Sequence, residues 1–456
     1  LQMIYGLLKF IISTSLKVFF RRISIYNNDR SPQDGPVIFV CNHPNLVIDA
    51  WLVGMTCKRR LFFLAKSTIF KGKFATWLLT SLGIIPVYRK QDNPEETIKN
   101  EDTFIKAYKI LENEGAFLIF PEGISVAERR LNKIKTGAAR IGFGALESID
   151  WSQDVTIMPV GLSYSDVIKF KSDVVIKYGN PIRLNDFKND YLENEFDTVK
   201  SVTGKIELAL RNLTTNVNII ESEEVVSALE SIYKKELMLE LGLDAKNTSD
   251  EFAATKGLVN GVEWYFQNKP DQVERFKTML SSYQEKLDLL QIKDEFLNPN
   301  TKSITLTDRI LMYLYMIIGL PIYLYGIATN FIPYKAPRWV AMKYNSAKSE
   351  IASIKLVVGM AVFISYYGLG IYLFHGLFND PAYTIAYALT LIPAGNFVLS
   401  YVRRIRRYRE HLRFLTMFYQ KTQIVNQLKD ERKALMSFID QARETYMRSN
   451  TEEIGK

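Results

Sequence analysis

Three long apolar segments in the second half of the chain restrict what it can fold into. They cover residues 310–332, 356–378 and 382–402, and each is long enough to cross the ~30 Å hydrocarbon core of a bilayer as a helix. Only Asn379-Asp380-Pro381 separates the second segment from the third, which predicts a helical hairpin. The chain is therefore expected to contain a membrane region beside its water-soluble parts.

Basic residues around these segments predict which side of the membrane their ends face. The arginine-rich run 403–409 follows the hairpin, and further lysine and arginine residues precede it between 335 and 348. Both flanks are therefore expected on the cytoplasmic side. Segment 310–332 contains Pro321 and is followed by Pro333, which favours a re-entrant or in-plane element. A third true crossing is the alternative.

The first 190 residues follow a different pattern, in which short apolar runs alternate with helical patterns. The runs that predict strands are 37–41, 61–65, 84–88, 116–120, 156–162 and 173–178. Helical patterns lie between most of them, notably at 95–113 and 135–147. This alternation predicts an α/β fold in which helices cover a mixed, largely parallel sheet.

The remaining segments complete a predicted division into five parts. The apolar run at the start is interrupted by Lys9 and Lys17, which favours a membrane-interface helix over a signal peptide, with an amphipathic core helix as the alternative. After residue 190, helical patterns such as 221–241 and 272–296 replace the strands. The predicted parts are an interface helix (1–30), an α/β domain (31–190), a helical subdomain (191–305), a membrane region (306–402) and a basic, helical, cytoplasmic tail (403–456).

Composition narrows the functional classes. Hydrophobic residues make up 47% of the chain and charged residues 23%, which is typical of a globular rather than a disordered protein. The two cysteines, Cys41 and Cys57, supply neither a disulfide framework nor a zinc site, so no metal is expected and a reducing compartment is favoured. The net charge of +9 is concentrated near the apolar segments, which favours an anionic membrane surface over nucleic acid as partner.

One histidine stands out as a candidate catalytic base. The chain has three histidines, and only His43 lies in the predicted α/β part, directly after the strand at 37–41. If the chain turns into a helix near Asp49, this carboxylate can accept the Nδ1 proton and leave Nε2 free to take a proton from a hydroxyl. A single histidine and aspartate at this spacing can occur by chance. The evidence for a catalytic role therefore depends on the segments that follow.

Three further segments lie near predicted strand ends. They are Gly83-Ile84-Ile85-Pro86-Val87-Tyr88-Arg89, Phe120-Pro121-Glu122-Gly123-Ile124-Ser125 and Ile157-Met158-Pro159-Val160-Gly161-Leu162. Together with residues 42–49, and in this order, they resemble the PlsC-like glycerolipid acyltransferase superfamily, which acylates glycerol-3-phosphate or its monoacyl product. This resemblance covers residues 1 to about 190.

A looser similarity of layout extends further along the chain. The segment 212–217, the helical section and the C-terminal apolar segments are similar to those of fungal-type glycerol-3-phosphate acyltransferases and their bacterial relatives. Two departures from the usual pattern are visible. Five residues separate His43 from Asp49 where four are usual, which the fungal-type branch tolerates, and the arginine often found after Glu122-Gly123 is missing.

The resemblance implies catalytic roles for three residues. His43 would act as the general base on the acceptor hydroxyl, and Asp49 would orient it and stabilise the imidazolium that forms. The turn at Gly123 would present backbone N–H groups to the thioester oxyanion. Because the acceptor alcohol is itself the nucleophile, no catalytic serine is needed.

The resemblance also implies how a phosphorylated acceptor would be bound. Arg89 fits a phosphate clamp, and Lys66 and Lys135 are further phosphate candidates, although each of the three is otherwise explained as a solvated surface charge. Glu122 would hold either a substrate hydroxyl or one of these cations.

The expected activity is transfer of a fatty acyl group from an acyl-CoA or acyl-ACP co-substrate to glycerol-3-phosphate, with lysophosphatidic acid as the alternative acceptor. No other cofactor is expected, and no oligomeric state is predicted. The expected partners are membrane lipids, and the expected location is the inner membrane with the catalytic domain in the cytoplasm. A non-catalytic lipid-binding or scaffold protein and a thioesterase or lipase compete with this interpretation. The scaffold interpretation is disfavoured because the chain retains His43, Asp49, Glu122 and Arg89. The thioesterase or lipase interpretation is disfavoured because the chain has no G-x-S-x-G motif.

Overall fold

The computed structural model describes residues 2–88, 95, 100–245, 247–297, 305–344, 347–420 and 422–454. The chain divides into two compact units, the first made of Leu1–Asn216 and Ala341–Val357, the second of Val217–Val340 and Val358–Lys456. The five predicted parts therefore do not coincide with the compact units. One difference concerns Ala341–Val357, which the sequence assigned to the membrane region and the structure joins to the α/β part.

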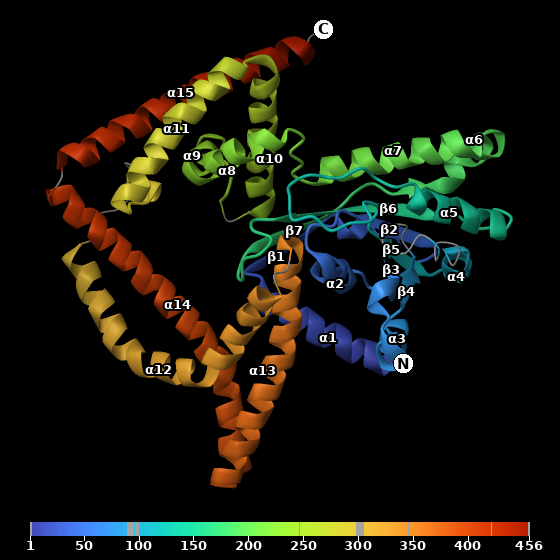
Figure 1. Ribbon diagram of the computed structural model, residues 1–456, viewed down its shortest axis with the longest axis horizontal. Coiled ribbons are helices and arrows are strands. Elements are labelled where there is room, and N and C mark those ends of the chain that lie inside the picture. The colour runs from blue at the N-terminus through green and yellow to red at the C-terminus, as the bar shows by residue number, and fades with distance from the viewer. Residues whose placement is uncertain are drawn as a thin grey trace. The chain divides into compact units, whose positions relative to one another are not determined.

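An eight-stranded sheet forms the centre of the first unit, in the order β1-β7-β6-β2-β5-β3-β4, with β8 paired to β6 (Figure 1). The strands are β1 (Arg22–Tyr26), β2 (Val37–Cys41), β3 (Leu61–Lys66), β4 (Ile84–Val87), β5 (Ala116–Ile119), β6 (Thr156–Tyr164), β7 (Asp173–Tyr178) and β8 (Ile182–Arg183). The five strands from β6 to β4 are mutually parallel, whereas β7 and β8 run antiparallel to β6. The predicted mixed, largely parallel sheet is confirmed.

Helices cover both faces of this sheet (Figure 1). They are α1 (Gln2–Phe19), α2 (Leu46–Thr56), α3 (Gly72–Ser81), α4 (Asn100–Glu112), α5 (Gly137–Ser148), α6 (Lys188–Glu193) and α7 (Glu195–Leu213). Alternation along β2 sends Ile38 and Val40 into one core, which contains residues of α4, α5 and α7. Phe39 points to the other face, where its ring meets that of Tyr178. Burial on both faces explains why β2 reads as a continuous apolar run.

The parallel register brings several chain segments to one edge of the sheet. Val40 pairs with Ile119 on one side and with Pro159 on the other. The residues that follow β2 and β5 therefore leave the sheet at the same carboxyl edge, as does Lys66 at the end of β3. Ligand sites of open α/β sheets lie at this edge.

Two strands of the sheet were not predicted, and the first helix has both buried and exposed apolar residues. β1 and β8 were not predicted, because β1 is a short run behind two arginines and β8 has two residues. The first helix, α1, buries Leu16 and Phe19 but exposes 61% of Leu7 and 68% of Phe10. It thus has one apolar face in the core and another facing outward.

The second unit is helical. It contains α8 (Glu223–Ile232), α9 (Lys234–Glu240), α10 (Thr248–Asn268), α11 (Pro270–Leu290), α14 (Pro381–Gln420) and α15 (Thr422–Ile454), together with most of α12 (Leu306–Lys343) and of α13 (Lys348–Phe378). A core that includes Tyr233, Tyr283 and Leu428 joins the shorter helices to α15. The buried Arg432 guanidinium of α15 donates to Asp294 at 3.0 Å and to Glu236 at 2.8 Å, which compensates its charge.

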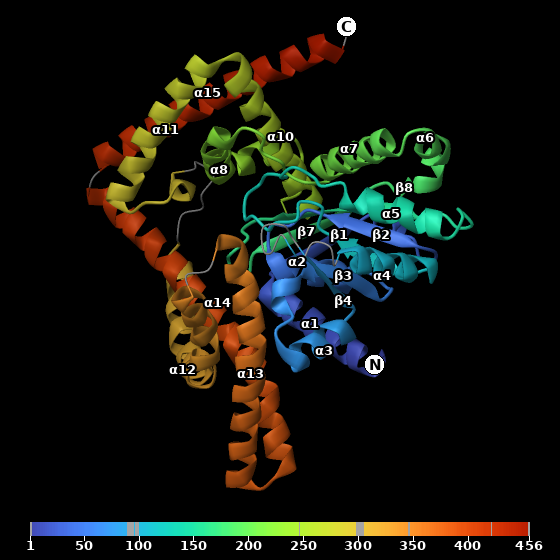
Figure 2. The ribbon, with the colours of Figure 1, turned by 45° about the vertical axis from the view of Figure 1, so that its right-hand side comes forward.

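Three helices in the described part of the chain are long and apolar enough to cross a membrane: α12, α13 and Pro381–Leu415 of α14. The ends of α13 and α14 lie side by side as a hairpin (Figures 1 and 2), where the rings of Phe374 and Tyr387 stack and His375 Nδ1 lies 3.0 Å from Thr384 Oγ1. Helix α12 is continuous but bends along its course (Figure 1), as expected of a helix with internal prolines. The re-entrant interpretation of 310–332 stays a prediction.

A buried polar cluster connects these three helices. Asn330 of α12 donates through Nδ2 to Gly326 O of its own helix and to Leu391 O of α14, at 3.0 and 3.3 Å. Its Oδ1 accepts the hydroxyl of Tyr367 from α13 at 2.5 Å. Hydrogen bonds of this kind hold helices together where the surrounding side chains are apolar.

At the sheet edge, Asp173 joins the start of β7 to the start of β1. It is 4% exposed, and its carboxylate accepts from Arg21 Nε at 2.9 Å and from Arg22 Nη2 at 2.7 Å. Burial alone would raise its pKa, but the two guanidinium groups outweigh burial and lower the pKa from 3.8 to about 2. A carboxyl with a depressed pKa stabilises the fold above its unfolded-state pKa and loses that contribution as the pH falls towards the folded-state value.

Asp173→Asn should therefore lower the melting temperature at pH 7. It should also flatten the loss of stability that the wild type shows between about pH 4 and pH 2. Thermal unfolding of the detergent-solubilised chain at several pH values measures both effects. The control is Asp154→Asn, which removes an ion pair with Arg183, 63% exposed, and should change the melting temperature little. Equal effects of the two variants would contradict a stabilising role for the arginine pair.

Candidate active site

The loop between β2 and α2 brings His43 and Asp49 together. β2 ends at Cys41 and α2 begins at Leu46, so Asp49 lies in the first turn of the helix. His43 Nδ1 lies 2.9 Å from Asp49 Oδ2. The histidine side chain is 15% exposed and the aspartate is fully buried. The contact predicted from the spacing of the two residues is present.

Asp49 is surrounded by donors that compensate its buried charge. The Asn45 N–H donates to Oδ2 at 2.6 Å, and the Tyr164 hydroxyl donates to Oδ1. A buried carboxylate without such partners would be strongly destabilising. Burial, together with the charge of Asp49, raises the pKa of Tyr164 well above its ordinary value. Tyr164 therefore stays protonated and remains a hydrogen-bond donor to Asp49.

Two contacts fix the orientation of the His43 ring. Its plane stacks on Phe120 with centroids 3.8 Å apart and an interplanar angle of 11°. Its Nδ1 faces Asp49, which favours the tautomer with an unprotonated Nε2. No side chain in the described ranges hydrogen-bonds to Nε2, so this nitrogen is available to a hydroxyl of a bound substrate.

The segment that follows β5 forms hydrogen bonds with the loop between β2 and α2, which contains His43 and is called the histidine loop below. The His43 N–H donates to Glu122 Oε1 at 2.9 Å, and the His43 carbonyl accepts from Val126 N at 3.2 Å. The Leu46 N–H donates to Ser125 Oγ at 3.0 Å. Leu46 has a φ of 41°, a left-handed conformation that is unfavourable for a residue with a branched side chain. The contacts around it maintain a strained turn between His43 and Asp49.

Glu122 braces this arrangement. Its second oxygen accepts from Asn132 N at 2.9 Å and from Asn132 Nδ2 at 2.8 Å, while the first accepts from His43 N. The side chain is 5% exposed. Both oxygens of Glu122 thus accept from N–H groups of the chain itself, and the expected contact with a substrate hydroxyl or a cation stays a prediction.

Gly123 shapes the turn but does not offer its own amide. Its φ of 70° favours glycine, and its N–H donates to Phe120 O at 3.1 Å. The expectation that this turn presents backbone N–H groups to an oxyanion therefore concerns amides other than that of Gly123, and it stays a prediction. The next two amides, of Ile124 and Ser125, form no hydrogen bond within the described segments, so they are the donors this turn can offer.

The three predicted phosphate ligands differ in what the structure says of them. A Cβ on Gly123 would lie 2.5 Å from Lys135 Nζ, so this ammonium group lies directly beside the turn. Lys66 is exposed at the end of β3, at the same edge of the sheet, without a described contact to His43. Arg89 lies outside the described residues.

Cys41 is buried close to the site but is not suited to nucleophilic chemistry. Burial raises the pKa of its thiol well above the ordinary value, and the charges of Asp49 and Glu122 raise it further. The thiol stays protonated, and a protonated thiol is a poor nucleophile. Among the described residues no group of three or more His, Cys, Asp or Glu side chains could hold a metal ion.

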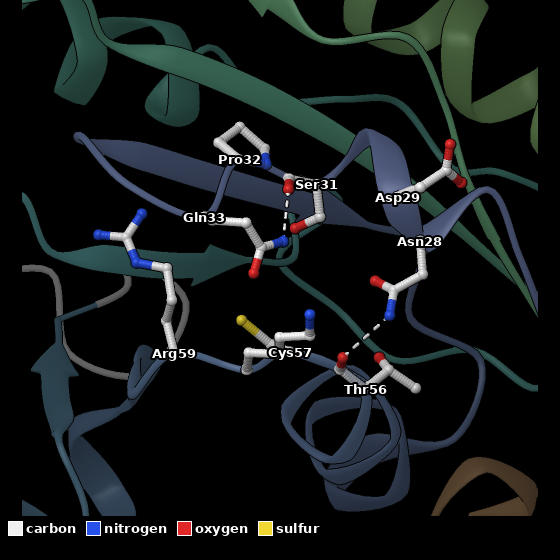
Figure 3. A pocket seen from close by; sticks show the side chains of 9 residues that line it. Asn28, Asp29, Ser31, Pro32, Gln33, Thr56, Cys57 and Arg59 are labelled. Atoms are coloured by element: carbon white, nitrogen blue, oxygen red, sulfur yellow. Dashed lines mark hydrogen bonds between the residues drawn. The ribbon is translucent and has the colours of Figure 1, made fainter.

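A pocket of about 270 Å³ is lined by neither His43 nor Asp49 (Figure 3). It is lined by Asn28, Asp29, Ser31, Pro32, Gln33, Thr56, Cys57, Lys58 and Arg59. These residues precede β2 or follow α2, so the pocket lies at the amino edge of the sheet. Asn28 Nδ2 closes one wall by donating to Thr56 O at 3.2 Å. The pocket has no part in the His43 site.

Four residues of the site were not found from the sequence: Asn45, Ser125, Asn132 and Tyr164. Only Tyr164 carried a usable signal. It lies at the end of β6, next to β2, and its side chain therefore emerges near the residues that follow β2. The other three act through backbone contacts, which depend on loop conformations that residue spacing does not specify.

Comparison with known proteins agrees with this geometry. Residues 22–163 match the protein family described as Acyltransferase. Glycerol-3-phosphate O-acyltransferase 2 of Saccharomyces cerevisiae is 30% identical over 200 residues, which is 44% of this chain and 26% of that protein. Glycerol-3-phosphate O-acyltransferase 1 of the same yeast is 21% identical over 61% of this chain and 47% of its own length.

A bacterial relative also matches. The 1-acyl-sn-glycerol-3-phosphate acyltransferase of Streptococcus pneumoniae is 26% identical over 41% of this chain and 64% of its own length. The chain thus spans less than two thirds of each of these three relatives. The crystal structure of PlsC from Thermotoga maritima, a 1-acyl-sn-glycerophosphate acyltransferase, has a TM-score of 0.33 and 19% identity, covering 44% of this chain and 78% of that one. The match of residues 22–163 to the Acyltransferase family, together with the similarity to these glycerolipid acyltransferases, confirms the resemblance that the four motifs predict.

Tyr164→Phe should reduce acyl-transfer turnover about tenfold, because a hydrogen bond to a charged group contributes about 1.5–3 kcal/mol and Asp49 would lose one of its donors. Initial rates of the purified variant measure this effect. The matched control is Tyr178→Phe, which removes a buried hydroxyl that contacts Thr56 instead. If both variants lose activity equally, the effect of Tyr164 reflects general stability rather than support of Asp49.

Proposed function

We propose that this chain is a membrane-bound O-acyltransferase that moves a fatty acyl group from an acyl thioester to the hydroxyl of glycerol-3-phosphate. The observation that carries the proposal is the His43–Asp49 pair, with 2.9 Å between Nδ1 and Oδ2, inside an acyltransferase domain. The ring is oriented by Phe120, and Asp49 is held by donors on both of its oxygens. This is the arrangement required of a general base.

The proposed reaction needs no covalent enzyme intermediate. The acceptor hydroxyl donates its proton to His43 Nε2 while its oxygen attacks the thioester carbonyl, and Asp49 stabilises the imidazolium. The amides of Ile124 and Ser125 are the proposed donors to the oxyanion. When the tetrahedral intermediate collapses, the carbon–sulfur bond breaks and the imidazolium returns its proton to the leaving thiolate. The products are an ester and a free thiol.

Cations at the carboxyl edge of the sheet are proposed to bind the acceptor phosphate. Lys135 has the strongest support, because its ammonium group lies beside the turn at Gly123, which follows β5. Lys66, the last residue of β3, is proposed as a further phosphate ligand. Arg89 is also proposed, on the basis of the sequence motif that it ends. Guanidinium suits paired contacts with phosphate oxygens, whereas ammonium acts as a point charge.

Glycerol-3-phosphate is the favoured acceptor and lysophosphatidic acid the alternative. Two of the relatives are named glycerol-3-phosphate acyltransferases, and one of these similarities extends over 61% of this chain. The longer spacing between His43 and Asp49 supports the same choice. The bacterial relative is named for the monoacylated acceptor, which keeps that substrate as the second candidate.

A thioesterase or lipase is less well supported. Ser125 is the serine of the third motif, but its Oγ accepts from Leu46 N and thereby supports the loop. A hydrolase would need a serine hydroxyl hydrogen-bonded to Nε2, and no such contact exists in the described segments. A non-catalytic scaffold would not need the compensated, ring-oriented pair that the site retains.

The purified chain in detergent should transfer the acyl group to radiolabelled glycerol-3-phosphate when given acyl-CoA or acyl-ACP. His43→Ala should lower this rate by about 10²–10⁴-fold, the usual loss for a missing general base. Parallel assays with lysophosphatidic acid decide between the two acceptors. A variant that keeps more than a tenth of the wild-type rate would exclude His43 as the base, and a wild type inactive with every pair of substrates would refute the proposal.

We also propose that the chain resides in the inner membrane with its catalytic domain in the cytoplasm. The hairpin of α13 and α14 has apolar, mostly exposed surfaces, and a basic run at 403–409 follows its second apolar segment. A topology reporter placed directly after Lys456 should then report a cytoplasmic location, and so should one placed before Arg22. Opposite locations of the two reporters would mean an odd number of crossings, so that α12 would be a third true span.

A further inference from the structure

The histidine loop has a third support, which comes from more than 300 residues further along the chain. Ser353 of α13 donates its hydroxyl to Asn45 O at 2.9 Å. Ser353 Oγ in turn accepts from the Ile48 N–H at 3.3 Å. The Ile48 N–H also donates to Asn45 O, at 3.1 Å. Ser353 is 2% exposed, and both of its partners are fully buried. One hydroxyl thus acts as donor and acceptor within the short stretch between His43 and Asp49.

The contact is part of a packed helix face. Ser349, Ala352, Ser353 and Leu356 are at most 5% exposed, and their spacing places them on one side of α13. The first ten residues of α13 belong to the same compact unit as the sheet, although the helix continues as a membrane-capable segment. This end of α13 is therefore built into the α/β unit.

The loop after β6 forms hydrogen bonds with both the histidine loop and α13. Asn45 Nδ2 donates to Val167 O at 3.0 Å, and Lys355 Nζ of α13 donates to Ile168 O at 3.3 Å. Asn45 is thus held by its side chain, while its carbonyl is held by Ser353 and its own N–H donates to Asp49 Oδ2. A displacement of Asn45 would move the donor that fixes the carboxylate facing His43.

We infer that Ser353 is a positioning residue of the active site, through which the hairpin helix α13 sets the geometry of the His43–Asp49 pair. The inference rests on the proposed acyl transfer. Leu46 has a left-handed φ of 41°, so the turn has no strong intrinsic preference for its shape and depends on external contacts. Ser125 holds the turn at Leu46, and Ser353 holds it at Asn45 and Ile48. Without Ser353 the loop would keep its fold but lose the alignment of Asp49 with the imidazole.

The test compares three substitutions in the full chain in detergent. Ser353→Ala removes the hydroxyl, Ser353→Thr keeps it, and Ser349→Ala makes the same change one turn earlier on the same buried face, where no side-chain hydrogen bond to residues 43–49 is present in the described chain. We expect Ser353→Ala to lower kcat about tenfold, because small displacements of catalytic groups have large effects on rate. The KM values of donor and acceptor should stay within about twofold of wild type, since the substituted residue does not touch either substrate.

Ser353→Thr should restore most of the rate, and Ser349→Ala should behave like the wild type. An unchanged kcat for Ser353→Ala, or equal losses of kcat and melting temperature in the two alanine variants, would overturn the inference. If Ser353→Ala fails to fold, Ser353→Cys keeps the volume while weakening the hydrogen bond, and the same criteria apply.

A second measurement separates this inference from the proposed function. Backbone-amide hydrogen exchange of peptides from residues 42–56 reports the hold of Ser353 on the loop without any turnover. Faster exchange in Ser353→Ala than in Ser349→Ala supports the contact even if the wild type transfers no acyl group, and in that case only the proposed function fails. Equal exchange in both variants would show that Ser353 does not hold the loop.

Discussion

The burial of the Asp49 carboxylate is the constraint on which the rest of the site depends. A fully buried negative charge is tolerable only if hydrogen-bond donors surround it, and here they are the Asn45 amide, the Tyr164 hydroxyl and His43 Nδ1. Two of these donors, His43 and Asn45, lie in the loop between β2 and α2, and the third, Tyr164, lies at the end of β6. Because each has to be in place for the charge to be compensated, the same contacts that make burial possible also orient the imidazole. Stability and chemistry are thus coupled at one carboxylate.

The parallel sheet explains why these features meet. β2 lies between β5 and β6, and the carboxyl ends of all three strands lie at the same edge. The residues after β5 supply Glu122 and Ser125 to the histidine loop, and the end of β6 supplies Tyr164 to Asp49. A sheet with β2 at its edge would offer a neighbour on one side only. The central position of β2, recorded in the sequence as a fully apolar run, is therefore a requirement of the site.

The sequence predicted what depends on local pattern and on the order of motifs. The six apolar runs became strands, the mixed sheet was correctly expected, and the spacing of His43 and Asp49 matches a strand–turn–helix connection. What it did not predict depends on distant partners. The resemblance implied that Glu122 holds a substrate hydroxyl or a cation, but the sequence did not indicate that its oxygens accept hydrogen bonds from His43 and Asn132. The turn at Gly123 was expected to present backbone amides to an oxyanion, but residue spacing did not show that the Gly123 amide itself donates to Phe120 O within the turn.

The limits of the apolar segment at 356–378 show the same principle. Hydropathy places its start near Leu356, whereas α13 begins at Lys348, because its first turns are amphipathic and their polar side chains are buried. A buried serine on such a helix carries no sequence signal, since its partners, Asn45 and Ile48, lie in another part of the chain. A hydropathy boundary marks where lipid-compatible composition begins, but not where a helix or a compact unit begins. In this chain α13 begins before that boundary, and the serine that contacts the loop between β2 and α2 lies in its first two turns, so one helix starts in the α/β unit and continues as a membrane-capable segment.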